Sequence, residues 1–222
     1  MKKKGLKTAS LSYEHDLTAQ GYRIIAGIDE AGRGAWAGPV VAGAVCLPLD
    51  RDDLPVLLEG VRDSKQLSPR ARAGLVERIQ NTALTWGIGA ANHDEIDQIG
   101  IVPATCLAMQ RALDAAVERA PHLQPDFLLL DSIRWLNLNR PHLALVKGDQ
   151  LSLSIAAASV LAKVYRDNLM VELDSAYPEY GFAVHKGYGT SQHQAALKTH
   201  GASPIHRMSY APLRLPADKP LW

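Results

Sequence analysis

Residues 24–34 read IIAGIDEAGRG, an apolar run that ends in two adjacent carboxylates and is followed by a glycine-flanked arginine. A buried strand that ends in Asp29 and Glu30 is costly unless something compensates the two charges. A divalent metal ion is one compensation, and Arg33 is another. The glycines let the backbone turn sharply and approach a ligand closely. We therefore interpret this stretch as the catalytic centre of a metal-dependent phosphodiesterase.

The composition is that of an ordinary globular chain, long enough to bury a core. The chain has 222 residues, 24 Lys and Arg against 23 Asp and Glu, and a formal net charge of +1. Any nucleic-acid site therefore has to be a local basic patch. Cys46 and Cys106 belong to no metal-type pair, which favours free thiols in a reducing compartment. No apolar run has the length of a membrane-spanning helix, and we predict a cytoplasmic protein.

Apolar patterning predicts an antiparallel meander in the first half of the chain. Residues 22–28 and 40–47 are apolar runs of strand length, and residues 82–90 read as a third strand. Ser68 followed by Pro69 marks the start of the helix between the second and third strands. Strands that follow one another so closely are expected to pair antiparallel.

The second half alternates helices with short apolar strands. In chain order it is expected to contain a helical stretch interrupted at Gly100, two buried strands, a long helix, a loop and a last helix, over residues 94–119, 127–130, 143–146, 152–173, 177–188 and 190–201. This order predicts a mixed α/β sheet with helices on its faces rather than a doubly wound parallel sheet.

Carboxylates follow three of the predicted strands: Asp29 with Glu30, then Asp131, then Asp149. Ligand sites in open α/β sheets form beyond the carboxyl ends of strands, and carboxylates hold hard divalent cations. Neighbouring strand residues point to opposite faces, so Asp29 and Glu30 share a site only if the chain leaves strand geometry at Glu30. We expect Ala31-Gly32 to provide that exit. One such acid alone is better explained as a strand end or a helix N-cap, but four acids at three strand ends favour a metal site.

These residues lie in motifs that together resemble the ribonuclease HII family. The motifs run in the family's order from about Tyr22 to Pro212. They are Ile28 to Gly34 with Ala37 to Ala42, Asp63-Ser64-Lys65, Lys147-Gly148-Asp149 with Ser152 to Ser159, Ala162-Lys163-Val164 with Arg166-Asp167, Tyr180-Gly181-Phe182, His185 to Thr190, and Pro204 to Arg207. Two positions depart from the pattern: Ser132 stands where glycine usually follows the third acid, and Gln66 replaces a second lysine.

The resemblance implies a ribonuclease-H-like α/β fold, a five-stranded mixed sheet flanked by helices, with a helical and looped C-terminal extension. We expect a flexible arm over residues 1–20, a catalytic domain over 21–202 and a proline-rich tail over 203–222. The implied protein is a monomeric endoribonuclease of DNA replication and ribonucleotide excision repair. It hydrolyses the RNA strand of RNA–DNA hybrids and nicks 5′ of ribonucleotides embedded in duplex DNA, leaving 3′-hydroxyl and 5′-phosphate ends.

The resemblance also implies roles for single residues. Asp29, Glu30, Asp131 and Asp149 are the expected catalytic residues and ligands of two divalent ions, Mg²⁺ or Mn²⁺. The substrate contacts are expected from Gly32, Arg33, Gly34, Ser64, Lys65, Ser154, Lys163, Lys186 and Tyr188. Residues 32–34 sense the 2′-hydroxyl that distinguishes RNA from DNA, and Tyr188 packs on the adjoining sugar. The hydroxyls and cations position the phosphates without reading sequence.

The same residues also have alternative explanations, either as structural residues or as parts of other classes of protein. Without the family match, Tyr188 is better explained as a loop tyrosine that packs on its neighbours, and His185 and His206 as structural residues. A nucleotide-binding P-loop is disfavoured because the glycine-rich loop closes with Gly38-Pro39 instead of Gly-Lys-Ser/Thr. A catalytically inactive nucleic-acid-binding module of the same fold is the remaining alternative, and the four retained acids argue against it.

Overall fold

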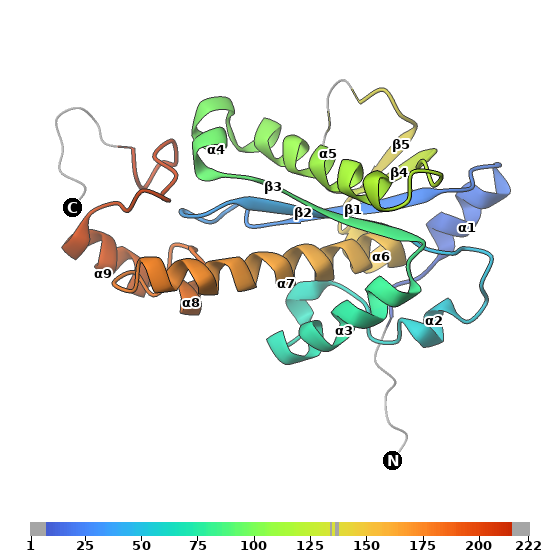
Figure 1. The fold of residues 1–222 in the computed structure, drawn as a ribbon, viewed down its shortest axis with the longest axis horizontal. Helices are drawn as coiled ribbons and strands as arrows, with labels where there is room; N and C mark the ends of the chain where they lie inside the picture. The colour runs from blue at the N-terminus through green and yellow to red at the C-terminus, as the bar shows by residue number, and fades with distance from the viewer. Residues whose placement is uncertain (1–7, 134, 136–137, 215–222) are drawn as a thin grey trace, which may run out of the picture.

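A five-stranded mixed sheet forms the centre of the computed structural model, which describes residues 8–133, 135 and 138–214. The strands lie in the order β3-β2-β1-β4-β5 (Figure 1). Their bounds are β1 Ile25–Ala31, β2 Val40–Cys46, β3 Thr85–Ala91, β4 Phe127–Asp131 and β5 His142–Leu145. β1, β2 and β3 pair antiparallel, whereas β1 with β4 and β4 with β5 are parallel. The predicted fold class and the predicted meander are confirmed.

Helices cover both faces of the sheet, with α4 and α5 on one face and α3 and α7 on the other (Figure 1). Their bounds, with η1 a 3₁₀ turn, are α1 Ser12–Ala19, α2 Leu54–Leu57, η1 Ser64–Gln66, α3 Pro69–Thr82, α4 His93–Ile99, α5 Ile101–Arg119, α6 Gly148–Leu151, α7 Leu153–Ala176, α8 Phe182–His185 and α9 Ser191–His200. The side chain of Ser68 caps α3 and Gly100 separates α4 from α5, as predicted. The side chain of Thr190 caps α9.

The helix α7 lies so close to the sheet that only small residues fit between them. A Cβ atom on Gly27 of β1 would lie 2.2 Å from the carbonyl carbon of Ser154, and one on Gly43 of β2 would lie 2.5 Å from the carbonyl oxygen of Ala158. Ala156 and Ala157 between them are completely buried. This close approach fixes the start of α7, and α6 just before it, next to β1.

Residues 8–20 are folded onto the domain, which corrects the expectation of a loose arm there; residues 1–7 lie outside the described part of the chain. The helix α1 buries Leu17 and the carboxylate of Glu14. Glu14 Oε1 accepts hydrogen bonds from Ser152 Oγ at 2.6 Å, Ser154 Oγ at 2.7 Å and Ser154 N–H at 2.9 Å. The apolar pattern missed this helix because the group it buries against α7 is an acid.

Three local expectations also need correction. β1 does not end at Ile28 but continues through both acids to Ala31. β5 is an edge strand whose first three residues are exposed, not a buried strand, because within the described residues it pairs with β4 alone. The expected loop over residues 177–188 contains the one-turn helix α8.

The C-terminal extension is packed on the domain as far as residue 214. His206 forms an isolated bridge with Ala37, and the completely buried Arg207 donates to the carbonyl oxygen of Gly38 at 2.9 Å. Residues 215–222 of the predicted tail lie outside the described residues. Within the described ranges, no helix has the length and apolar character needed to cross a membrane.

Candidate active site

Three carboxylates meet at the point where β1 and β4 end. The parallel pairing of β1 with β4 brings Asp29 next to Asp131. The Gly148 N–H donates to Asp131 Oδ1 at 2.7 Å, which holds the start of α6 at the same point. Asp149 of α6 thereby joins the pair, and one oxygen atom from each acid lies within 4.8 Å of the others. Carboxylate oxygens at this spacing suit a hard divalent cation.

The three carboxylates repel one another in a buried setting. Burial, followed by the charges of Glu30 and Asp131, raises the pKa of Asp29 well above its ordinary value. Burial, followed by the charges of Asp131 and Asp63, raises the pKa of Asp149 to about 6. Ionising all three acids therefore costs free energy, and a divalent cation among them would offset that cost. The donor set fits a divalent metal ion.

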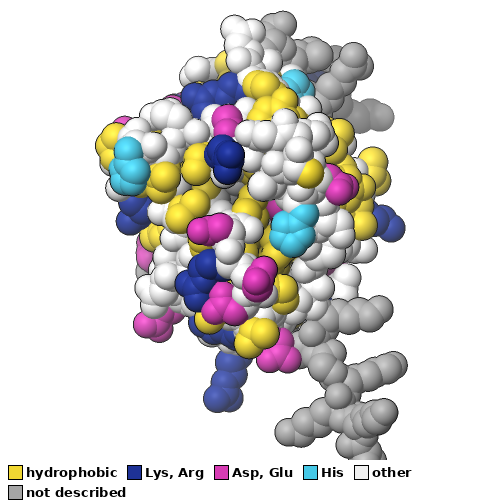
Figure 2. Space-filling view, turned by 90° about the vertical axis from the view of Figure 1, so that its right-hand side faces the viewer, with side chains coloured by type: hydrophobic (Ala, Val, Ile, Leu, Met, Phe, Trp, Pro, Cys, Tyr) yellow, Lys and Arg dark blue, Asp and Glu magenta, His cyan; other side chains and the backbone are white. Residues whose placement is uncertain are grey.

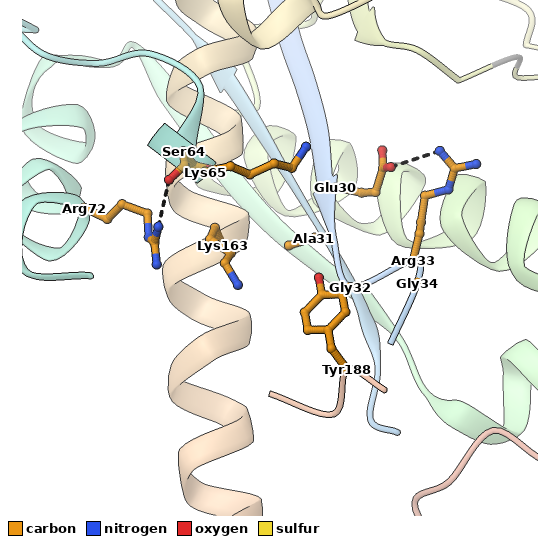
Figure 3. Close-up of a pocket in the computed structure, with 10 residues that line it drawn as sticks. All are labelled: Glu30, Ala31, Gly32, Arg33, Gly34, Ser64, Lys65, Arg72, Lys163 and Tyr188. Carbon is orange, nitrogen blue, oxygen red and sulfur yellow. Dashed lines mark hydrogen bonds and ion pairs between the residues drawn. The ribbon is translucent and has the colours of Figure 1, made fainter. Parts of the chain in front are cut away.

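Glu30 lies beside this group but on the other side of β1. Because the strand continues to Ala31, the Glu30 side chain points to the face opposite Asp29, and the expected exit from strand geometry does not occur. Glu30 Oε1 accepts from Arg33 Nη1 at 3.2 Å (Figure 3). Burial raises the pKa of Glu30, although Arg33 opposes this. Glu30 Oε2 is buried and has no hydrogen-bond partner among the described residues, as expected of an atom that awaits a cation.

A cavity of about 580 Å³ opens beside these acids (Figure 3). Its lining comes from four parts of the chain: Glu30, Ala31, Gly32, Arg33, Gly34, Ser64, Lys65, Arg72, Lys163 and Tyr188. Four of these side chains are cationic, and one is anionic. The cavity is therefore a local basic patch on a near-neutral chain, whereas on the face seen in Figure 2 acidic and basic side chains are interspersed.

Lys65 extends from η1 toward Glu30 (Figure 3). Partial burial lowers the pKa of Lys65, but the carboxylates of Asp29 and Asp149 outweigh it and raise the pKa above its ordinary value. Asp63 holds the turn, since its Oδ1 accepts from the Lys65 N–H at 2.9 Å and its Oδ2 from Gln150 Nε2 at 3.2 Å. The ammonium group thus stays charged next to the acids, where a phosphate would approach.

Arg72 is a lining residue that the sequence analysis missed. Its buried guanidinium donates to two carbonyl oxygens of the η1 turn, those of Ser64 at 2.7 Å and Leu67 at 2.8 Å. It also pairs with Asp167 of α7 at 3.3 Å, and Asp167 accepts from Lys163 Nζ at 2.6 Å. The network ties η1 to α7 and fixes two cations of the cavity relative to each other.

Two expected substrate contacts do not lie in the cavity wall. Ser154 is completely buried, and its hydroxyl donates to Glu14. Lys186 follows α8 in a left-handed conformation, and its ammonium group donates to the carbonyl oxygen of Ala183. Both residues lie in motifs of the family pattern, but the structure gives them contacts within the protein.

Two buried arginines hold the loop that carries Gly32 and Arg33, and sequence reasoning assigned them no role. Arg166 Nε donates to the Pro39 carbonyl at 2.9 Å, and Arg207 Nη1 donates to the Arg33 carbonyl at 3.0 Å. Gly32 has φ +94°, and a Cβ atom there would lie 1.9 Å from Arg166 Nε. A signal for Arg166 exists in the sequence, because it stands four residues from Ala162 and Met170 on an apolar stripe of α7.

Ser132 occupies the position where the family pattern has glycine. It adopts φ +43°, a left-handed conformation that favours glycine. Its hydroxyl donates to Asp131 Oδ1 at 3.1 Å and accepts from the Lys147 N–H at 3.2 Å. The serine thus keeps the sharp turn after the third acid and adds a hydrogen bond to it.

The fold and the site together define a metal-dependent nuclease of the ribonuclease-H-like class. The sequence model of the family described as Ribonuclease HII matches residues 26–213. Ribonuclease HII from Synechococcus sp. (strain JA-3-3Ab) is 55% identical over 205 residues, which cover 92% of this chain and 89% of that protein. The chain belongs to the ribonuclease HII family.

Solved structures show the same fold. The crystal structure of ribonuclease H2 from Pyrococcus horikoshii OT3 superposes with a TM-score of 0.70 and 26% sequence identity, covering 86% of this chain and 95% of that one. Bst-RNase HIII in complex with Mn²⁺ superposes with a TM-score of 0.66 over 87% of this chain and 68% of that one. At 20% identity the second likeness concerns the fold alone.

Proposed function

We propose that the chain is an endoribonuclease that hydrolyses the RNA strand of RNA–DNA hybrids and nicks duplex DNA on the 5′ side of embedded ribonucleotides. The single observation that carries this proposal is the meeting of Asp29, Asp131 and Asp149 within 4.8 Å beside a cavity with a cationic lining. Membership of the ribonuclease HII family supports it. An inactive binding module is not favoured, because the chain retains all four acids.

In this proposal, Mg²⁺ or Mn²⁺ ions complete the site. The unpartnered Glu30 Oε2 and the group of Asp29, Asp131 and Asp149 would hold two of them. When bound, the ions supply an activated water and neutralise charge on the scissile phosphate. The manganese complex of the fold relative supports this choice of ions.

The chain's own residues then bind and orient the substrate. Lys65 and Lys163 face the cavity as ammonium groups that bind backbone phosphates and set the position of the duplex. Gly34, where a side chain would meet nothing within 4 Å, leaves the backbone of this loop open to close approach by the sugar carrying the 2′-hydroxyl, the group that separates RNA from DNA. Tyr188 stands across the cavity from Lys65 (Figure 3). In this proposal its ring packs on the adjoining sugar.

The place of action is proposed to be the cytoplasm, and the working form a monomer active in DNA replication and ribonucleotide repair. Cys46 and Cys106 are both free thiols, which supports a reducing compartment.

Analytical ultracentrifugation with and without a hybrid duplex tests whether the protein is a monomer. A dimer in the free protein would contradict it.

The decisive experiment uses a DNA duplex with one embedded ribonucleotide and, in parallel, a long RNA–DNA hybrid. With Mg²⁺ or Mn²⁺ we expect nicking 5′ of the ribonucleotide, with 3′-hydroxyl and 5′-phosphate ends, and EDTA should abolish it. The matched all-DNA duplex should remain intact. The proposal would be overturned if neither substrate were cleaved with Mg²⁺ and neither were cleaved with Mn²⁺.

Asp131→Asn tests the assignment of the third acid. The substitution keeps the shape of the side chain but removes the charge that the cation needs, so we expect turnover to fall by at least about a hundredfold. Duplex binding, measured by fluorescence anisotropy, should stay measurable because the cationic lining is intact. The exposed Asp52→Asn is the control, and full activity of Asp131→Asn would show that the acid is misassigned.

A further inference from the structure

Three buried imidazoles pack together beneath Tyr188. His185 belongs to α8, His193 to α9, and His206 to the C-terminal extension. The rings of His185 and His193 stack with centroids 4.5 Å apart, and those of His193 and His206 lie 5.1 Å apart. His193 and His206 are 0% and 1% exposed, so neither ring contacts the substrate.

The hydrogen bonds of two of these rings, His206 and His193, form a chain with a single direction. His206 Nδ1 lies 2.8 Å from the Ser203 N–H, which can only donate, and 2.7 Å from the Ser203 hydroxyl, which can donate as well. Both contacts are shorter than the 3.3 Å to the Ser203 carbonyl oxygen, so we assign Nδ1 as an acceptor. A neutral His206 therefore carries its proton on Nε2 and donates it to His193 Nε2 at 2.9 Å. His193 in turn carries its proton on Nδ1, 3.1 Å from the carbonyl oxygen of Tyr188. The tautomer of each ring follows from the one before it.

The surroundings keep these rings neutral. Burial, with the neighbouring rings adding to it, lowers the pKa of both His193 and His206 to about 4. The ionisable groups that face the pair are His185 from α8, Tyr180, which lies 5.1 Å from His206, and His93 of α4. No carboxylate within the described residues pairs with either ring, so a proton gained there would have no counter-charge.

This hydrogen-bond chain ends on the backbone of Tyr188, which lines the cavity. The Tyr188 carbonyl accepts from His193, and the Tyr188 N–H donates to the carbonyl oxygen of His185 at 2.9 Å. Trp36, two residues after the Gly32-Arg33-Gly34 loop, packs on the His193 ring at 5.6 Å and donates its N–H to the Gly187 carbonyl at 2.8 Å. The imidazoles thus connect both loops to which a sugar-sensing role is assigned.

We propose that His193 and His206 are positioning residues, whose directional hydrogen-bond chain fixes Tyr188 for recognition of single ribonucleotides. The proposal rests on the proposed function and deepens it. A side chain that packs on a sugar needs a fixed backbone, since small displacements weaken such positioning strongly. We expect cleavage of long hybrids, in which every residue of one strand is a ribonucleotide, to depend less on the position of this tyrosine.

The first test needs no substrate. Imidazole ¹⁵N spectra of the full chain at pH 7 should show the Nε2–H tautomer for His206 and the Nδ1–H tautomer for His193. His193→Asn and His206→Gln assign the signals. The opposite tautomer of either residue, or an imidazolium at pH 7, would overturn the proposal whether or not the protein cleaves RNA.

The second test compares two substitutions of one residue. His193→Asn retains a donor at the position of Nδ1, whereas His193→Leu removes it. Losing this hydrogen bond should lower the ratio of kcat/KM on single ribonucleotides to kcat/KM on long hybrids by on the order of tenfold in His193→Leu, and by less than about threefold in His193→Asn. Tyr188→Ala should change the ratio in the same direction, and the exposed His122→Leu should leave it unchanged.

The proposal would be overturned if His193→Leu lowered kcat/KM equally on both substrates, or if the Asn and Leu variants lowered the ratio equally. Either result would show that the hydrogen-bond chain has only a structural role. Should His193→Leu fail to fold, as judged by circular dichroism, His206→Gln against His206→Leu makes the same comparison, because only glutamine keeps a donor toward His193. A wild-type protein inactive on both substrates would refute the proposed function instead, and the spectra would still decide the hydrogen-bond chain.

Discussion

Asp29, Asp131 and Asp149 differ from ordinary strand-end acids in their lack of ion-pair partners among the described residues. The carboxylates raise the pKa of Lys65, which keeps its positive charge beside them. Lys65 is an exposed residue, however, and offsets only part of their repulsion. The metal-free protein therefore stores unfavourable electrostatic energy at the proposed catalytic site. Substitutions there should separate stability from activity.

Asp149→Asn should stabilise the metal-free protein while it inactivates the enzyme. The folded-state pKa of about 6 lies above the ordinary 3.8, so the carboxylate destabilises the fold above pH 6 and has no such effect below pH 3.8. Removing the charge should raise the free energy of unfolding by up to about 3 kcal/mol at pH 8 in EDTA and by little at pH 4. Urea unfolding at both pH values measures this, with Asp52→Asn as the control. Equal effects at both pH values would contradict the electrostatic explanation.

Elements made of apolar runs could be predicted from the sequence, and elements whose buried side chains are polar could not. β1 to β4 and the caps of α3 and α9 follow from apolar runs and local capping chemistry. α1 escaped prediction because it buries Glu14, and the direction of Glu30 was wrong because the strand end depends on pairing with β2, as in Glu30 with Ala42. The partners of Arg72 lie on the preceding η1 turn and on α7, so the sequence around Arg72 does not indicate that its guanidinium is buried.

The close approach of β1 to α7 predicts opposite effects for two glycine substitutions. Gly27→Ala forces a Cβ atom to 2.2 Å from backbone carbon, so the helix has to move and the free energy of unfolding should fall by about 3 kcal/mol. Gly74→Ala in α3 meets nothing within 4 Å, and helix propensity should raise stability by about 0.5–1 kcal/mol. Urea unfolding compares the two variants. A tolerated Gly27→Ala would show that α7 is not seated tightly on the sheet.

At the scale of the whole molecule, the two ends of the described chain hold the site from opposite sides. Glu14 of α1 fixes the start of α7 next to Asp149, and Arg207 of the C-terminal extension fixes the loop that contains Arg33. In Figure 1 these segments lie at opposite ends of the sheet. Both anchors are buried polar groups, so the position of the proposed catalytic residues depends on packing that spans the molecule.

The hydrogen-bonded pair of His193 and His206 makes the packing of the C-terminal extension sensitive to acid. His193 and His206 have folded-state pKa values of about 4 against an ordinary 6.5, so between these values the unfolded chain binds protons that the folded chain does not. Their contribution to stability is complete above pH 6.5 and is lost as the pH falls toward 4, with about 2 kcal/mol per histidine lost between pH 7 and pH 5. In EDTA the acids of the metal site change the free energy of unfolding in the opposite direction as the pH falls. These acids are present both in the wild type and in a His193→Asn/His206→Gln double variant, so their effect cancels when the two proteins are compared. The difference in unfolding free energy between these two proteins should therefore shrink by several kcal/mol from pH 7 to pH 5. A difference independent of pH would mean that the two rings are not buried as neutral imidazoles.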